Sequence, residues 1–134
     1  MNRSQISHIG IAVTDLEKAI EKFGLVTGNR SPEICEVVDQ QVRVAMFGGD
    51  GGRIELVAAT TADSPVARFI EKRGEGLHHI CLYVDDIETI LGELKQAGVK
   101  LIDETPRVGA EGRLIAFVHP SSMNGVLIEL EQRD

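Results

Sequence analysis

The chain has 134 residues, of which 43% are hydrophobic and 26% are charged, a balance typical of a globular protein. No apolar run approaches the roughly 20 residues that a membrane-spanning helix needs, and the formal net charge of -7 argues against general binding to nucleic acid or to an anionic membrane. The two cysteines lie far apart in the sequence and are expected to be free thiols in a cytoplasmic protein.

The first predicted element is a strand over residues 7–13, Ser-His-Ile-Gly-Ile-Ala-Val. Alternate side chains of a strand point to opposite faces, so His8 lies on the face of the small residues and away from the bulky aliphatic ones. Thr14 and Asp15 follow as a helix-capping pair, and the apolar residues after them recur at i, i+3, i+4 and i+7. This pattern predicts an amphipathic helix that ends near Gly28.

Three strand-like runs complete the first half of the chain, at residues 33–39, 41–47 and 53–58. The glycine-rich stretch at residues 48–52 predicts a hairpin loop, because no helix follows it to bind a phosphate. Residues 62–73 then predict a connector helix with a proline in its first turn.

The second half of the chain repeats the first. Residues 78–88 match residues 7–17 at five of eleven positions, at a shift of 71 residues, and the next helix keeps the same apolar spacing. Three further strand-like runs follow, at residues 100–104, 113–119 and 125–131. Each half therefore reads βαβββ, which predicts an α+β fold built from two modules.

Modules of about 60 residues are small enough to need each other for stability. We therefore expect a single domain over residues 1–134. Its modules are expected at about 5–60 and 76–132, with the connector helix at about 63–73.

Two of the four histidines hold the same place in the two modules. His79 matches His8 at the shift of 71 residues and lies on the strand face opposite the aliphatic side chains. His78 points to the aliphatic face, and His119 precedes Pro120, so both are interpreted as structural residues.

Two glutamates are duplicated in the same way. Glu55 and Glu129 each stand between two aliphatic residues, in the matching segments Arg-Ile-Glu-Leu-Val and Leu-Ile-Glu-Leu-Glu. Both carboxylates therefore face the half-enclosed side of the sheet, where an unpaired charge is costly. The sequence thus predicts that His8, Glu55, His79 and Glu129 bind one divalent metal ion, for which Mn²⁺, Co²⁺, Ni²⁺, Fe²⁺ and Zn²⁺ are suitable.

This arrangement resembles the vicinal oxygen chelate superfamily, which includes glyoxalase I, and more narrowly the methylmalonyl-CoA epimerase family. The most specific stretch is residues 63–81, Asp-Ser-Pro-Val-Ala-Arg-Phe-Ile-Glu-Lys-Arg-Gly-Glu-Gly-Leu-His-His-Ile-Cys. Further similar stretches are Pro-Arg-Val-Gly-Ala at 106–110, Ala-Phe-Val-His-Pro at 116–120 and Gly-Val-Leu-Ile-Glu-Leu at 125–130. The resemblance implies a cupped mixed sheet around one metal ion, in a homodimer that acts on a coenzyme A thioester.

The implied reaction interconverts (2R)- and (2S)-methylmalonyl-CoA through α-proton abstraction and a metal-stabilised enolate. Inversion needs a proton carrier on each face of the planar intermediate, and Glu129 and Glu55 are the expected pair. Two features depart from the family pattern: some members have Gln at the position of Glu55, and some carry a further Glu on the preceding strand. Here residues 41–45 read Gln-Val-Arg-Val-Ala, which leaves the second proton-transfer group open.

Two other functions use the same fold. One is a glyoxalase I-type lactoylglutathione lyase with the same ligands, and the other is a metal-free module that binds a small molecule. Metal content would separate the binding module from the two enzymes, and substrate choice would separate the enzymes. No residue is assigned to coenzyme A, although six cations are candidates for its phosphates: Arg43, Arg53, Lys72, Arg73, Arg107 and Arg113.

Overall fold

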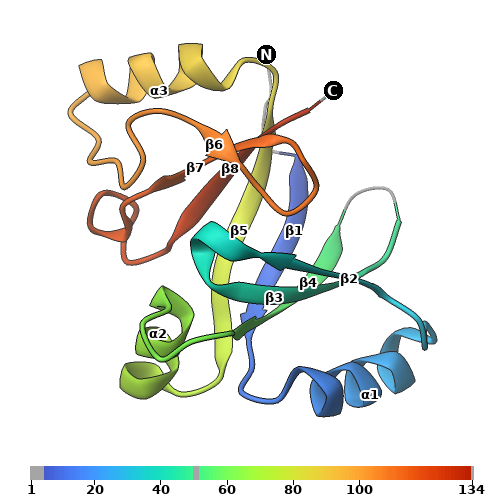
Figure 1. The fold of residues 1–134 in the computed structure, drawn as a ribbon. Coiled ribbons are helices and arrows are strands. Elements are labelled where there is room, and N and C mark those ends of the chain that lie inside the picture. Colours follow the sequence, from blue (N-terminus) through green and yellow to red (C-terminus); the bar gives the residue numbers. More distant parts are fainter. Residues whose placement is uncertain (1–4, 50–51, 134) are drawn as a thin grey trace. The chain divides into compact units, whose positions relative to one another are not determined.

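The computed structural model describes residues 5–49 and 52–133, and it divides into two compact units. The N-terminal unit is His8–His78, and the C-terminal unit comprises Met1–Ser7 and His79–Asp134. Two strands cross this division, β1 (Ile6–Ala12) and β5 (Gly76–Val84) (Figure 1). The tip of the predicted glycine-rich hairpin, residues 50–51, lies outside the described residues.

The strands of the N-terminal unit have the spatial order β2-β3-β4-β1. Their bounds are Glu33–Val37 for β2, Val42–Phe47 for β3 and Arg53–Ala59 for β4. β1 runs parallel to β4, and the other neighbours are antiparallel. Helix α1 (Leu16–Thr27) packs on β3 and β4, while α2 (Pro65–Arg73) packs on β4.

Local signals explain both ends of α1. The Asp15 side chain caps the helix by accepting a hydrogen bond from the Lys18 amide at 3.1 Å. Gly28 ends it with a φ of 79°, a left-handed conformation that glycine adopts without steric cost. The buried face of the helix joins a core built from seven residues, which are Val13, Leu16, Ala19, Ala45, Phe47, Leu56 and Ala58.

The C-terminal unit repeats this plan with the spatial order β5-β8-β7-β6. Its later elements are α3 (Ile87–Gln96), β6 (Arg107–Val108), β7 (Leu114–Val118) and β8 (Ile128–Gln132). β5 runs parallel to β8, and α3 packs on β7 and β8. The Asp86 carboxylate caps α3 by accepting from the Thr89 amide at 3.2 Å, as the repeat predicted.

The prediction of a strand at residues 100–104 is wrong. Of these residues only Leu101 forms a bridge, to Val118. The Asp103 carboxylate instead accepts the backbone N–H of Phe117 at 2.8 Å, so a side chain takes the donor that a strand would have paired. The edge strand of this unit is the two-residue β6, which pairs with β7.

The strand predicted at residues 33–39 is shorter than expected. β2 ends at Val37, and the 3₁₀ helix η1 follows at Val38–Gln40. Gln41 then adopts a φ of 57°, which turns the chain into β3. A second 3₁₀ helix, η2 (Pro120–Ser122), precedes β8.

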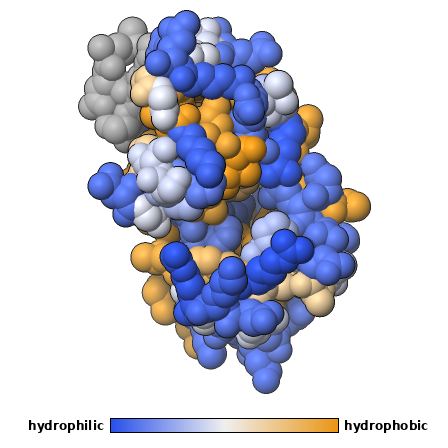
Figure 2. All heavy atoms as spheres, turned by 90° about the vertical axis from the view of Figure 1, so that its left-hand side faces the viewer, coloured by the Kyte–Doolittle hydropathy of each residue, from blue (hydrophilic) through white to orange (hydrophobic). Residues whose placement is uncertain are grey.

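Apolar side chains reach the surface in both units. The large exposed ones are Ile6, Leu25, Val26, Ile34, Val38, Leu77, Ile102, Val108 and Val126. Figure 2 shows one face, on which hydrophobic residues lie among hydrophilic ones. Within residues 5–49 and 52–133, no helix combines the length and the apolar character needed to cross a membrane.

Candidate active site

In the N-terminal unit, His8 and Glu55 form a buried pair on neighbouring parallel strands. Gly10 of β1 lies opposite Glu55 of β4, and cross-strand neighbours share a face of the sheet. His8 stands two residues before Gly10, so its side chain lies on the same face. His8 Nε2 is 3.6 Å from Glu55 Oε1, and both side chains are buried.

In the C-terminal unit, His79 and Glu129 form the corresponding pair. Cys81 of β5 lies opposite Glu129 of β8, in the same relative register as Gly10 and Glu55. His79 Nε2 is 3.0 Å from Glu129 Oε1, and both residues are buried. The structure therefore brings each predicted histidine to the predicted glutamate of its own module.

The neighbouring His78 has different contacts. Its ring meets the ring of Phe69 on α2 edge-on, with a centroid distance of 4.8 Å and an interplanar angle of 79°. His78 is only partly buried, whereas His79 is buried beside a carboxylate. Packing against an aromatic ring is consistent with a structural role for His78.

The chemistry of each pair fits a cation. A carboxylate oxygen and an imidazole nitrogen that carries no hydrogen are both hydrogen-bond acceptors, so they repel when they face each other directly. A proton on the nitrogen or a metal cation between the two atoms removes this repulsion. The 3.0 Å between His79 and Glu129 is a hydrogen-bond distance, whereas the 3.6 Å between His8 and Glu55 is longer than one. Imidazole nitrogen and carboxylate oxygen are also common ligands of divalent transition metals.

Comparison with known proteins identifies the family. Residues 7–117 match the Glyoxalase/Bleomycin resistance protein/Dioxygenase superfamily. A mitochondrial methylmalonyl-CoA epimerase of Dictyostelium discoideum is 37% identical, over 96% of this chain and 78% of its own. An ethylmalonyl-CoA/methylmalonyl-CoA epimerase of Cereibacter sphaeroides is 36% identical, over 96% and 97%. A solved methylmalonyl-CoA epimerase in complex with methylmalonyl-CoA and NH₄⁺ superposes with a TM-score of 0.90 at 32% identity, covering 98% of this chain and 95% of that one.

The chain belongs to the methylmalonyl-CoA epimerase family. This membership confirms the resemblance found in the sequence and the predicted α+β class with two βαβββ modules. It also confirms the predicted enzyme class at the level of the family, whose members named above are epimerases.

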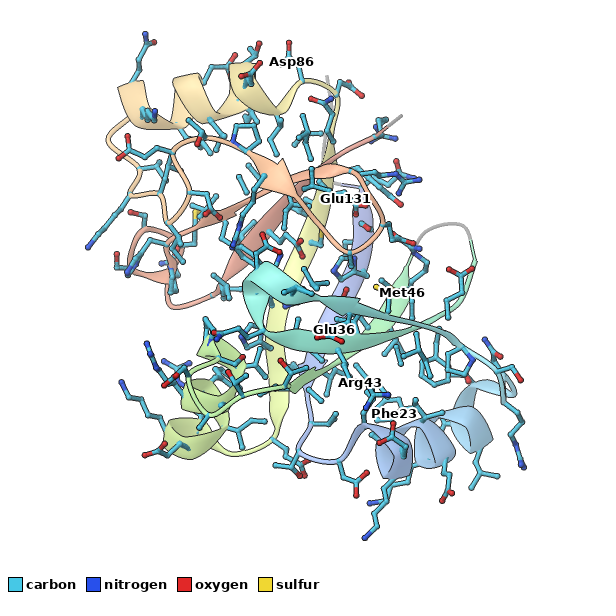
Figure 3. The ribbon with its side chains drawn as sticks, in the orientation of Figure 1. Phe23, Glu36, Arg43, Met46, Asp86 and Glu131 are labelled. Atoms are coloured by element: carbon cyan, nitrogen blue, oxygen red, sulfur yellow. The ribbon has the colours of Figure 1, made fainter. Side chains whose placement is uncertain are left out.

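Sequence reasoning missed Glu131, a second buried carboxylate on the face of Glu129 (Figure 3). Glu131 is only 3% exposed, and three donors surround its carboxylate. Ser7 Oγ donates to Oε1 at 2.6 Å, Cys81 Sγ lies 3.6 Å from the same oxygen, and Arg113 Nη1 is 3.2 Å from Oε2. Because alternate residues of a strand share a face, the sequence places Glu131 on the same face as Glu129. It was missed because the first module has no carboxylate at the equivalent position.

The two pairs also differ in the residue on the third strand. Met46 of β3 lies opposite Glu55, and Phe117 of β7 lies opposite Glu129. The Phe117 ring meets the imidazole of His79 edge-on, at a centroid distance of 5.8 Å and an interplanar angle of 82°. An aromatic contact therefore fixes the orientation of the second histidine.

Of the candidate cations for coenzyme A, Arg43 points away from the face of Glu55. Val44 and Met46 lie on the same face of β3 as Glu55. The side chain of Arg43, next to Val44, therefore points to the opposite face. There it pairs with Glu17 of α1 at 3.0 Å, and Figure 3 shows it directed toward that helix. Arg43 is therefore a surface residue of the helix side.

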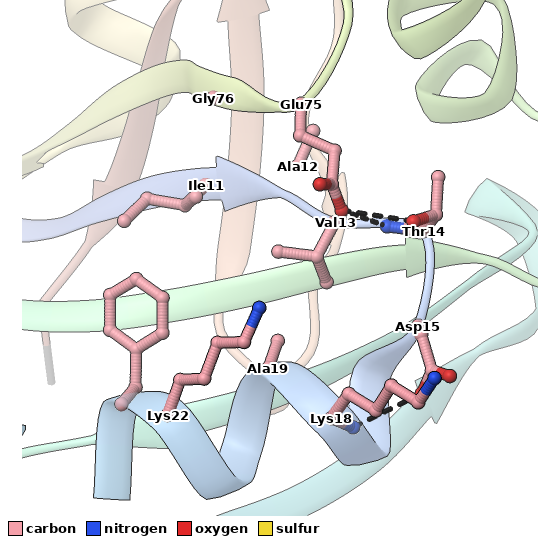
Figure 4. A pocket seen from close by; sticks show the side chains of 11 residues that line it. Ile11, Ala12, Val13, Thr14, Asp15, Lys18, Ala19, Lys22, Glu75 and Gly76 are labelled. Atoms are coloured by element: carbon pink, nitrogen blue, oxygen red, sulfur yellow. Dashed lines mark hydrogen bonds between the residues drawn. The ribbon is translucent and has the colours of Figure 1, made fainter. Parts of the chain in front are cut away.

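A cavity of about 550 Å³ also lies on the helix side, between α1 and β1 (Figure 4). Its walls include Ile11 and Val13, which point away from the face of His8. At its rim Glu75 accepts two hydrogen bonds from Thr14, from the amide at 2.7 Å and from the hydroxyl at 3.0 Å. These bonds lower the pKa of Glu75 below its ordinary value. The cavity is separate from the His8 and Glu55 pair.

Proposed function

We propose that this protein interconverts the two C2 epimers of methylmalonyl-CoA. The observation that carries this proposal is the duplicated pairing of a buried histidine with a buried glutamate, in matching register, in a chain of the methylmalonyl-CoA epimerase family. Support for the thioester comes from the solved relative that binds methylmalonyl-CoA. A homodimer and a cytoplasmic location remain part of the proposal.

The proposed ligands of one divalent ion are His8, Glu55, His79 and Glu129, whose atoms fit Mn²⁺, Co²⁺, Ni²⁺, Fe²⁺ or Zn²⁺. When bound, such an ion supplies Lewis acidity toward the oxygens of a thioester. The imidazoles orient the carboxylates beside them, and all four residues are buried, which limits the access of water.

The glutamates carry the proton transfer in this proposal. Glu129 accepts the proton from C2 of one epimer, and Glu55 returns a proton to the other face of the planar enolate. The roles exchange in the reverse direction, because each epimer presents its hydrogen to a different carboxylate. Inversion therefore needs both glutamates, whereas loss of the α-proton from a single epimer needs one.

Isotope exchange in D₂O tests this division of roles. Glu129→Gln should slow net inversion by about 10²- to 10⁴-fold, the usual contribution of a general base. One epimer should still exchange its α-hydrogen through Glu55, and the double variant with Glu55→Gln should exchange neither epimer. Glu88→Gln, which changes an exposed glutamate in the first turn of α3, is the matched control.

Three results would contradict the proposal. Unchanged inversion in Glu129→Gln would remove that residue from the chemistry. Unchanged inversion in Glu55→Gln would make Glu55 a ligand only, and the second base would have to be sought elsewhere. Turnover of methylglyoxal with glutathione, without any exchange at C2 of methylmalonyl-CoA, would favour a glyoxalase-type lyase instead.

A further inference from the structure

Arg107 lies on the same face as the His79 and Glu129 pair, one aromatic ring away. It pairs with Ile115 across β6 and β7, in the row of cross-strand neighbours that continues to Glu131. Its guanidinium carbon lies 5.8 Å from the centre of the Phe117 ring, and that ring contacts His79. The arginine is thus a fixed cation close to the second His and Glu pair.

Asp103 holds Arg107 in this position. One oxygen of the Asp103 carboxylate accepts the Phe117 amide at 2.8 Å, and the other lies 3.5 Å from Arg107 Nε. The same carboxylate therefore anchors both the strand and the arginine that lies over its aromatic ring. The β6 to β7 hairpin that carries Arg107 is closed by the Gly109 amide, which donates to the Arg113 carbonyl at 2.8 Å.

The guanidinium still has capacity to bind an anion. Arg107 Nε is buried, and its ion-pair partner Asp103 lies 3.5 Å away without forming a hydrogen bond to it. A ligand cannot reach this buried nitrogen, but the side chain as a whole is 35% exposed, so part of it is open to an anion. By contrast, Arg113 on the same face is already paired with Glu131 at 3.2 Å.

The internal repeat shows that this cation is not part of the duplicated scaffold. Arg107 lies opposite Ile115, and the equivalent position in the first module, opposite Val44, is occupied by Cys35. The second module therefore has a guanidinium where the first has a thiol. A positive charge in only one of the two modules suits a substrate whose acyl group carries a negative charge on one side of C2.

We propose that Arg107 is a specificity-determining residue that binds the free carboxylate of a 2-carboxyacyl thioester. This inference rests on the proposed function and deepens it. A planar guanidinium matches a carboxylate with two parallel hydrogen bonds, and it distinguishes carboxyacyl groups from uncharged acyl groups. The coenzyme A phosphates are the other oxyanions of the substrate, and the experiment separates the two sources.

Arg107→Gln should raise KM for methylmalonyl-CoA about tenfold to a hundredfold, with a much smaller change in kcat, because a charge-assisted hydrogen bond to the substrate is lost. Malonate should bind Arg107→Gln at least tenfold more weakly than the wild type in calorimetric titrations of the metal-loaded protein, while binding of coenzyme A stays the same. Arg107→Lys should recover part of the malonate binding, because it keeps the charge and loses only the planar fork.

Arg133→Gln is the matched control. Arg133 also lies over an aromatic ring, Tyr83, at 5.1 Å, and also pairs with an aspartate, Asp85, at 3.0 Å. It should leave malonate binding unchanged. Weaker binding of coenzyme A with unchanged malonate binding would assign Arg107 to a phosphate and overturn the proposal, as would unchanged binding of both. Because malonate binding is measured without turnover, its outcome is distinct from failure of the epimerase assay.

Discussion

The hydrogen bond from Ser7 to Glu131 should make a large contribution to stability. Both residues are buried, at 0% and 3% exposure, and the distance of 2.6 Å is typical of a hydroxyl bound to a charged carboxylate. Ser7→Ala removes one of the donors to Glu131 and leaves a buried charge with fewer partners. Hydrogen bonds to charged groups contribute about 1.5–3 kcal/mol, so we expect a loss of about 2 kcal/mol.

Urea denaturation followed by far-ultraviolet circular dichroism measures this loss, and the chain contains no tryptophan that would report it by fluorescence. With a slope of about 2 kcal/mol per molar urea, the midpoint should fall by about 1 M. Removing bound metal with a chelator beforehand separates the effect from any change in metal content. A double-mutant cycle with Glu131→Gln should give a coupling energy of about 1 kcal/mol or more. A midpoint shift below about 0.25 M without coupling would refute the reasoning.

Three further predictions concern metal binding, pH and packing. His79→Ala should lose most of the divalent metal that the protein binds, and His78→Ala little of it, as measured by metal analysis after reloading; equal losses would contradict the assignment of faces. Because the pKa of Glu75 is lowered in the folded state, its contribution is present above the unfolded value of about 4.5 and is lost as the pH falls through the folded value. The stability difference between the wild type and Glu75→Gln, a few tenths of a kcal/mol for this exposed group, should therefore be seen at pH 7 and vanish in acid. Gly109→Ala should destabilise the folded protein by about 1–3 kcal/mol in thermal melts, because the added Cβ would lie 2.8 Å from a methyl group of Ile115. Gly92→Ala, at an open position of α3, should instead stabilise it by about 0.5–1 kcal/mol in the same assay.

The helices could be predicted because their signals are local. Asp15 and Asp86 cap α1 and α3, Gly28 ends α1, and the apolar spacing identifies the buried face of each helix. The edge of the C-terminal unit could not be predicted in this way. Whether residues 100–104 pair as a strand depends on Asp103, whose carboxylate reaches an amide 14 residues further along the chain.

The repeat made the His and Glu pairs visible in the sequence, and the same reasoning hid Glu131. A search for duplicated polar residues finds Glu55 and Glu129 but not a carboxylate whose counterpart is aliphatic, as Val57 is. The partners of Glu131 also come from distant parts of the chain, since Ser7 is 124 residues away. The role of Arg107 depends likewise on a ring contact that only the fold creates.

The surroundings of the two glutamates differ, so their substitution should have unequal effects. Glu129 is 3.0 Å from its histidine and has Phe117 opposite it, whereas Glu55 is 3.6 Å from its histidine and has Met46 opposite it. A neutral amide should be tolerated better at the position of Glu55, which lies further from its histidine, and the family resemblance, in which some members carry Gln there, points the same way. We therefore expect Glu55→Gln to retain at least tenfold more kcat/KM than Glu129→Gln, measured from each epimer separately. Equal losses would show that the difference in local environment has no consequence for the reaction, and that the two carboxylates act as interchangeable proton carriers.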